Sequence, residues 1–141
     1  MTPPQKLTSL TLAADMDHLP AFMACVTEAA RGHGLGPELV AKIDLVVEEV
    51  ITNICKYGAA PGPVELVCLG SAEAFFLEIV DAGRPFDITA LPEPDLTKDV
   101  ANRPIGGLGV YFIKKAADKL EYRREGGRNV LRLTFRKVPA A

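Results

Sequence analysis

The chain of 141 residues has no tryptophan and only three cysteines, Cys25, Cys55 and Cys68. The three lie far apart in apolar stretches, whereas a secreted domain of this size usually pairs its cysteines. We therefore expect reduced, buried thiols in a cytoplasmic protein. The first residues, Met1–Pro4, have neither the basic start nor the apolar core of a signal peptide, which favours the same compartment.

The sequence also lacks a long hydrophobic run and an excess of either charge. No apolar stretch approaches the roughly 20 residues that cross a bilayer, so we expect no membrane partner. The formal net charge is -2, and Lys and Arg are interspersed with Asp and Glu, which argues against a nucleic-acid partner. Hydrophobic residues make up 48%, as in an ordinary globular protein. At this length we expect a single domain covering residues 1–141.

The apolar periodicity predicts an α+β fold. Alternation over residues 6–13 predicts a strand that buries Leu7, Leu10 and Leu12, and Asp15 is placed to cap a following helix. Further helices are expected at 37–57 and 106–118, central strands at 64–69 and 74–80, and a closing hairpin at 120–124 and 129–137. This order suits a two-layer α/β sandwich, with one mixed sheet covered on one face by three helices.

The long helix contains the first pattern of functional interest. Glu49 and Asn53 are four residues apart and therefore lie on one edge of the helix, beside the apolar face. A carboxylate and an amide oxygen there could hold a hard cation or position a proton acceptor. A polar helix border explains the same pair, and the pair alone favours that explanation. The residues expected on the buried face are Leu39, Ile43, Val46, Val47, Val50 and Ile54.

A second pattern, Asp81–Asp87, follows an apolar strand. Asp81 could accept a hydrogen bond from an exocyclic amine, and Gly83 would let a flat ring approach the backbone. Asp, Gly and Pro are also the usual residues of turns, and the segment alone favours a simple turn.

A third pattern is the glycine-rich run Gly106–Gly109 at the expected start of a helix. Backbone N–H groups free of bulky side chains form an anion site at a helix N-terminus. A helix-entry turn that needs positive φ accounts for the glycines equally well. The run is not a P-loop, because no Gly-Lys-Ser/Thr occurs, and it lacks the strand–turn–helix start of a dinucleotide-binding fold.

The three patterns in this order supply the metal, base, adenine and phosphate parts of a nucleotide site. Glu49–Asn53, Asp81–Asp87 and Gly106–Gly109 resemble the N, G1 and G2 boxes of the GHKL ATPase superfamily. The sequence most resembles the bacterial anti-sigma regulatory serine kinases, over about the whole chain and including residues 121–131. The resemblance implies the histidine-kinase-like ATPase (Bergerat) fold.

The resemblance also implies ATP and Mg²⁺ as cofactors. Glu49 would be the general base, Asn53 would coordinate Mg²⁺, and Asp81 would bind the adenine amino group with Gly83 beneath the ring. Residues from about 88 to 105 would form a lid. Such a site suffices because phosphoryl transfer needs mostly positioning and charge neutralisation. The other residues expected to contact the nucleotide are Phe86, Arg103, Gly106, Gly107, Leu108, Gly109 and Asn129.

Two positions depart from the family pattern. Many relatives have a Thr near the start of the last strand, where it supports the adenine-binding acid. Arg128 and Asn129 stand there in this chain, and Asn129 could provide the same support by a hydrogen bond. No basic residue directly precedes the glycines. Arg103 is the nearest candidate to meet a γ-phosphate, and a solvated lid charge is an equal alternative.

The resemblance implies a partner-switching kinase that phosphorylates a STAS-domain antagonist and sequesters a sigma factor or another regulator. A non-catalytic, nucleotide-dependent binding module is the alternative, and a dinucleotide-dependent enzyme is a weaker one. A complete sensor histidine kinase is not expected, because His18 and His33 border proline and glycines and suggest solvated loop or helix-end positions. A homodimer is expected by analogy with the family.

Overall fold

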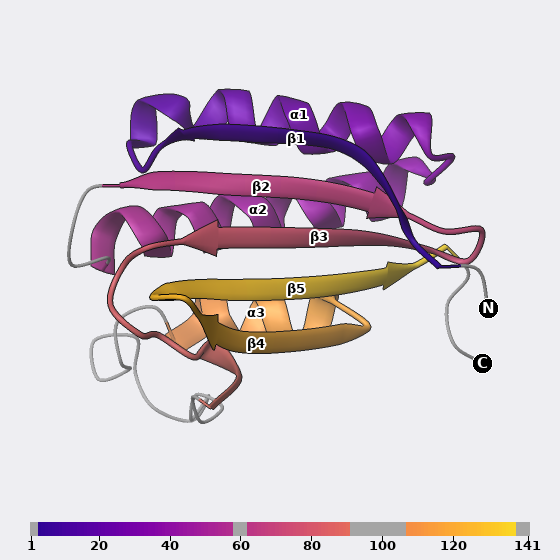
Figure 1. Ribbon diagram of the computed structural model, residues 1–141. Coiled ribbons are helices and arrows are strands. Elements are labelled where there is room, and N and C mark those ends of the chain that lie inside the picture. The colour runs from indigo at the N-terminus through magenta and orange to yellow at the C-terminus, as the bar shows by residue number, and fades with distance from the viewer. Residues whose placement is uncertain (1–2, 58–61, 91–106, 138–141) are drawn as a thin grey trace.

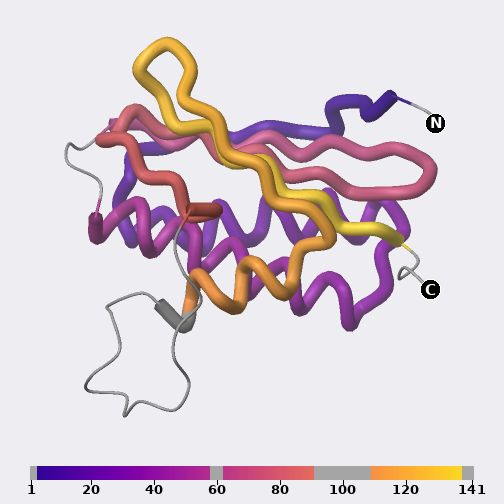
Figure 2. Tube along the Cα trace, turned by 90° about the horizontal axis from the view of Figure 1, so that it is seen from below, coloured from indigo at the N-terminus to yellow at the C-terminus, as the bar shows by residue number. Residues whose placement is uncertain are grey.

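The computed structural model describes residues 3–57, 62–90 and 107–137, and of residues 107 and 108 the backbone alone. Within these ranges, three helices cover one face of a single sheet (Figure 1): α1 (Leu19–Gly32), α2 (Pro37–Tyr57) and α3 (Gly107–Ala116). The view at right angles shows the helices and the sheet as two layers (Figure 2). The predicted two-layer α+β sandwich is confirmed. Among the described helices, none is both long and apolar enough to cross a membrane.

The five strands lie in the order β1-β2-β3-β5-β4. Every described pairing is antiparallel, so the prediction of a mixed sheet is wrong. Two helices connect β1 to β2, and the chain therefore returns in the opposite direction. One helix connects β3 to β4, which run the same way, but β5 lies between them and is antiparallel to both. The strands span Gln5–Ala13 (β1), Pro63–Gly70 (β2), Ala74–Asp81 (β3), Lys119–Glu125 (β4) and Arg128–Arg136 (β5).

Helix α2 lies behind β2 and β3, between α1 and α3 (Figure 1). Four of its six predicted core residues are buried, and the other two, Leu39 and Ile54, pack partly buried against the core. Val40 and Ile51 are buried in addition. Both lie on the flank that faces α1, where the Thr27 hydroxyl donates a hydrogen bond to the carboxylate of Asp44. The period of a helix does not show which flank a neighbouring helix will cover.

In β1 the side chain of Leu7 is 41% exposed, so its predicted place in the core is wrong. The pairing with β2 shifts by one residue between Lys6 and Thr8. Leu7 is therefore the extra residue of a β-bulge, which interrupts the alternation of the strand. Leu10 and Leu12 pack against the core as expected.

The end of α1 is tied to the turn between β2 and β3 by His33. Its Nε2 atom lies 2.6 Å from the Ser71 carbonyl oxygen and 3.2 Å from that of Ala74. The ring also lies so close to Gly70 that a Cβ there would overlap it. His33 therefore stands at a helix end, as expected, but it is a half-buried link between the two layers and not a solvated residue.

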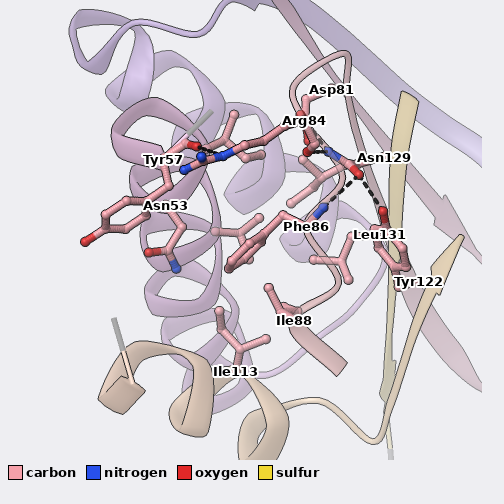
Figure 3. A pocket seen from close by; sticks show the side chains of 13 residues that line it. Asn53, Tyr57, Asp81, Arg84, Phe86, Ile88, Ile113, Tyr122, Asn129 and Leu131 are labelled. Carbon is pink, nitrogen blue, oxygen red and sulfur yellow. Dashed lines mark hydrogen bonds between the residues drawn. The ribbon is translucent and has the colours of Figure 1, made fainter. Parts of the chain in front are cut away.

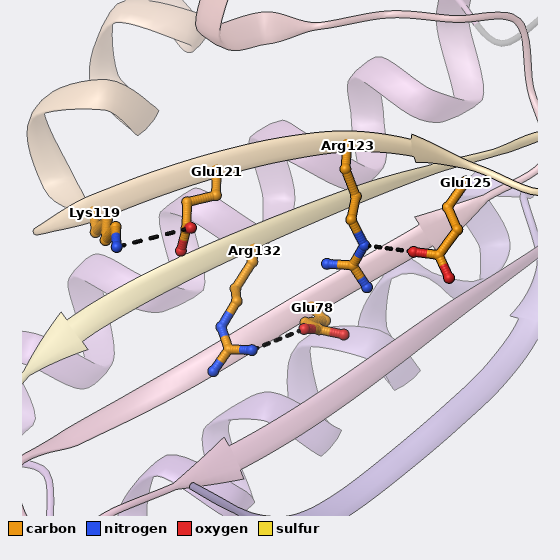
Figure 4. Close-up of polar contacts among 6 residues, drawn as sticks. All are labelled: Glu78, Lys119, Glu121, Arg123, Glu125 and Arg132. Carbon is orange, nitrogen blue, oxygen red and sulfur yellow. Dashed lines mark hydrogen bonds and ion pairs between the residues drawn. The ribbon is translucent and has the colours of Figure 1, made fainter. Parts of the chain in front are cut away.

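The face of the sheet away from the helices carries charged side chains (Figure 4). Its ion pairs are Lys119–Glu121 (3.7 Å), Arg123–Glu125 (2.7 Å) and Arg132–Glu78 (3.1 Å). The first two pairs are exposed and contribute little to stability. They lie on the edge strand β4, where charges discourage pairing with a strand of another molecule.

The three cysteines are free thiols, as expected. Only Cys68, on β2, is fully buried, and that burial raises the pKa of its thiol to about 12. Cys25 and Cys55 are half-buried, and partial burial raises the pKa of both thiols as well. The expectation of buried thiols is thus met in full by Cys68 alone. Such thiols are poor nucleophiles, because the thiolate is the reactive form.

Candidate functional site

A pocket opens between α2, the ends of β3 and β5, and the segment that follows β3 (Figure 3). It contains about 560 Å³ of empty space when its mouth, which is open to solvent, is included. Its walls are mainly apolar and suit a flat, weakly polar group. The apolar lining residues are Val50, Ile54, Ile79, Phe86, Ile88, Ile113 and Leu131.

Asp81, the last residue of β3, lines this pocket. Its Oδ1 atom accepts hydrogen bonds from the Gly83 backbone N–H at 2.9 Å and from Asn129 Nδ2 at 3.2 Å. No described residue donates to Oδ2. One carboxylate oxygen therefore holds the side chain in place, and the other can accept a hydrogen bond from a ligand.

Asn129 joins Asp81 to the segment after β3. Asn129 lies near the start of β5, opposite Asp81 in the pairing of β5 with β3, and its side chain is buried. Besides the bond to Asp81, Nδ2 donates to the Arg84 carbonyl at 2.9 Å, and Oδ1 accepts from the Phe86 N–H at 3.3 Å. The bond to Asp81 is the support that the sequence suggested for this position.

Two further residues of the pocket region, Tyr122 and Arg124, were missed by the sequence analysis. Both come from β4. The Tyr122 hydroxyl donates to Asn129 Oδ1 at 2.6 Å, and Arg124 Nη1 donates to the same oxygen at 3.1 Å and to the Gly83 carbonyl at 2.7 Å. A signal for Arg124 existed, because the expected hairpin ends one strand at residue 124 and begins the next at residue 129, and these two residues pair in the structure.

Arg84 connects the same segment to α2. Its Nε donates at 3.0 Å to the carbonyl of Tyr57, the last residue of that helix. The last carbonyls of a helix have no partner within it, and a cation there also complements the helix dipole. The end of α2 and the end of β3 are thereby held on opposite sides of the pocket.

Asn53 projects into the pocket from α2 (Figure 3). Its Nδ2 atom is buried and has no hydrogen-bond partner in the described part of the chain. A buried polar group without a partner costs about 1–3 kcal/mol, so native proteins seldom leave one without a reason. A polar ligand in this pocket would offset that cost.

Glu49 lies one helical turn before Asn53 and faces the start of α3. A Cβ added to Gly109 would overlap its carboxylate, so the two residues are in close contact. Gly109 does not have positive φ, so a side chain at this position would disturb the carboxylate of Glu49 and not a turn conformation. Glu49 has no hydrogen bond or ion pair with any described residue. Residues of two separately predicted motifs thus meet in the fold.

Other predicted site residues are placed only in part. Gly83 is buried, and Phe86 is 39% exposed on the pocket wall. Gly107 and Leu108 begin α3, as expected. Arg103, Gly106 and most of the expected lid, residues 91–105, lie outside the described residues.

The described residues contain no group of three or more His, Cys, Asp or Glu side chains that could hold a metal ion. Mg²⁺ does not require one, because it is usually held by one or two protein oxygens together with phosphates and waters. The absence of such a group therefore does not argue against Asn53, the ligand that the sequence suggested.

The fold and the pocket define a two-layer nucleotide-binding domain. The family model of the histidine kinase-like ATPase domain matches residues 12–135, which include all three motifs. The chain belongs to this family of ATP-binding domains. A search among curated proteins found no match.

Proposed function

We propose that the chain is an anti-sigma-factor-type serine kinase, which binds Mg-ATP and phosphorylates a Ser or Thr of a STAS-domain antagonist. The observation that carries the proposal is the position of Glu49. Its carboxylate lies against the glycine-rich start of α3 without a partner among the described residues. A carboxylate near the triphosphate opposes ATP binding by charge repulsion. Its presence there is explained if it serves the reaction.

The residues of the pocket, together with Glu49 and the start of α3 outside its lining, would divide the work. Asp81 would accept a hydrogen bond from the adenine amino group through its open oxygen, between apolar walls that fit the ring. Asn53 would coordinate Mg²⁺, and the backbone of Gly107 and Gly109 would bind phosphate. ATP supplies the phosphoryl group, and Mg²⁺ neutralises its charge. Glu49 would accept the proton of the attacking hydroxyl.

A nucleotide-dependent binding module is the second candidate function. Asn53, Asp81 and Asn129 would hold a nucleotide whether or not Glu49 acts as a base, because none of the three is hydrogen-bonded to Glu49. In such a module the nucleotide would only set the surface that binds a sigma factor or another regulator.

Thermal unfolding followed by a transfer assay tests the proposal. A ligand at 100 times its Kd stabilises the folded state by about 2.7 kcal/mol, which raises Tm by several degrees in a domain of this size. We expect this shift with ATP and Mg²⁺, a smaller one with ATP and EDTA, and none with NAD. Labelled phosphate should then pass from ATP to a STAS-domain antagonist. A shift without any transfer would favour the binding module, and no shift would contradict both functions.

Replacing Gly109 by Ala is expected to lower phosphoryl transfer at least about 10-fold with little change in Tm. The added Cβ would displace the carboxylate of Glu49, whereas the backbone N–H that could bind phosphate is kept. Glu49 can move because its side chain is flexible, and Ala is favoured over Gly within a helix by about 1 kcal/mol. Transfer rate and Tm of the same variant measure the two effects separately.

Gly32→Ala is the matched control, since Gly32 also lies in a helix and a Cβ there meets no atom within 4 Å. Its transfer rate should equal that of the wild type. Normal transfer by the Gly109→Ala variant would show that the position of the Glu49 carboxylate does not matter.

A further inference from the structure

We propose that Tyr122 and Asn129 together determine which base the pocket accepts, by fixing the orientation of Asp81 and so the position of Oδ2, the acceptor that it offers to the ligand. The three side chains form a chain of contacts, with Tyr122 OH bonded to Asn129 Oδ1 at 2.6 Å and Asn129 Nδ2 bonded to Asp81 Oδ1 at 3.2 Å. The inference rests on the proposed nucleotide site and adds Tyr122 to it as a positioning residue that acts through Asn129.

The orientation of the Asn129 amide is decided by its neighbours. Its oxygen receives Phe86 N–H and Arg124 Nη1, which can only donate, and its nitrogen faces the carboxylate of Asp81 and the carbonyl of Arg84, which can only accept. A rotation of the amide by 180° would place oxygen against both acceptors and nitrogen against the donors. One orientation therefore satisfies all the neighbours.

The Tyr122 hydroxyl makes the shortest of the bonds to the Asn129 oxygen, at 2.6 Å against 3.1 Å and 3.3 Å for the other two. Tyr122 also lines the pocket, and it packs against the apolar core. Removing the hydroxyl alone would leave the ring in place and loosen the amide. The hydrogen bond from Asn129 to Asp81 would then be less well held.

The consequence for a ligand follows from the two oxygens of Asp81. Oδ1 is occupied by the donors Gly83 N–H and Asn129 Nδ2, and Oδ2 remains for the ligand. A 6-aminopurine can donate to Oδ2 from its amino group, whereas a 6-oxopurine would place an acceptor against an acceptor. Sites built around a specific hydrogen bond reject analogues that cannot form it. A carboxylate free to rotate would discriminate less.

The experiment compares the Kd of ATP and of GTP, each with Mg²⁺, for the wild type and three variants: Tyr122→Phe, Asn129→Thr and the double variant. We expect Tyr122→Phe to lower the preference for ATP over GTP by about 3- to 10-fold, the size of one hydrogen bond. Thr has no side-chain amide whose orientation Tyr122 could fix, but its hydroxyl can donate a hydrogen bond to Asp81. The Tyr122→Phe change should therefore have no further effect on the preference in the Asn129→Thr background.

Tyr111→Phe is the matched control, because Tyr111 lies on α3 outside the pocket, beside Lys115. Its preference for ATP should be that of the wild type. An unchanged preference in Tyr122→Phe, in a chain whose wild type binds ATP, would overturn this inference and leave the proposed function standing. Equal effects of Tyr122→Phe with Asn and with Thr at position 129 would also overturn it. A wild type that binds neither ATP nor GTP would contradict both this inference and the proposed function.

Discussion

Replacing Glu49 by Gln is expected to reduce phosphoryl transfer to a STAS-domain antagonist by at least about 100-fold, the usual contribution of a general base. Gln has nearly the same shape and should keep the contact with Gly109, so the fold should be unaffected. ATP binding should be unchanged or tighter, because the variant removes a negative charge from the phosphate end of the site. Transfer of labelled phosphate and the Kd of ATP, measured on the same preparation, separate the two effects.

Glu48→Gln is the control for this experiment. Glu48 is the next acid along α2 and is exposed to solvent, so its removal makes the same change in net charge away from the site. It should leave transfer intact. Full activity in the Glu49 variant would identify Glu49 as a polar residue of the helix border and would favour the binding module. Loss of ATP binding in that variant would instead give Glu49 a structural role.

Replacing Asp81 by Asn is expected to weaken ATP binding by about 10- to 100-fold, the range for a hydrogen bond to a charged group. The neutral amide loses the charge of the open oxygen, and an amide nitrogen at either oxygen position faces a donor. One position meets Gly83 N–H and Asn129 Nδ2, and the other meets the amino group of the ligand. Isothermal titration with ATP and Mg²⁺ measures the loss.

Glu65→Gln is the matched control for Asp81. Glu65 lies on β2 between the buried residues Val64 and Leu66, and its side chain therefore faces away from the helices. ATP should bind this variant as it binds the wild type. If Asp81→Asn bound ATP normally, the pocket would hold the adenine by its apolar walls alone, and the role proposed for Asp81 would be wrong.

Short-range patterns in the sequence were sufficient for much of the fold. The apolar period of residues 37–57 placed Glu49 and Asn53 on one edge of α2, and the nearly continuous apolar run 74–80 placed Asp81 directly after a central strand. These features depend on side chains only a few residues apart, whose relative directions a helix or strand imposes. Leu7 shows the limit of that argument, because a bulge in the pairing with β2 changed its direction.

The motifs resembling the nucleotide-binding boxes also came from the sequence, but their contacts did not. The placement of β5 between β3 and β4 made the sheet antiparallel and brought Asn129 beside Asp81. The meeting of Glu49 with Gly109 depends on how α3 packs against α2.

Composition, periodicity and motifs by themselves determined the class of fold, the elements and the three segments of the site. Only the tertiary structure decided that Tyr122 bonds to Asn129, that Arg84 holds the end of α2, and that Gly109 makes room for a carboxylate. The reason is physical. Local geometry is set by residues close in the chain, whereas each of these contacts requires the relative position of elements that only the packing of the whole core establishes.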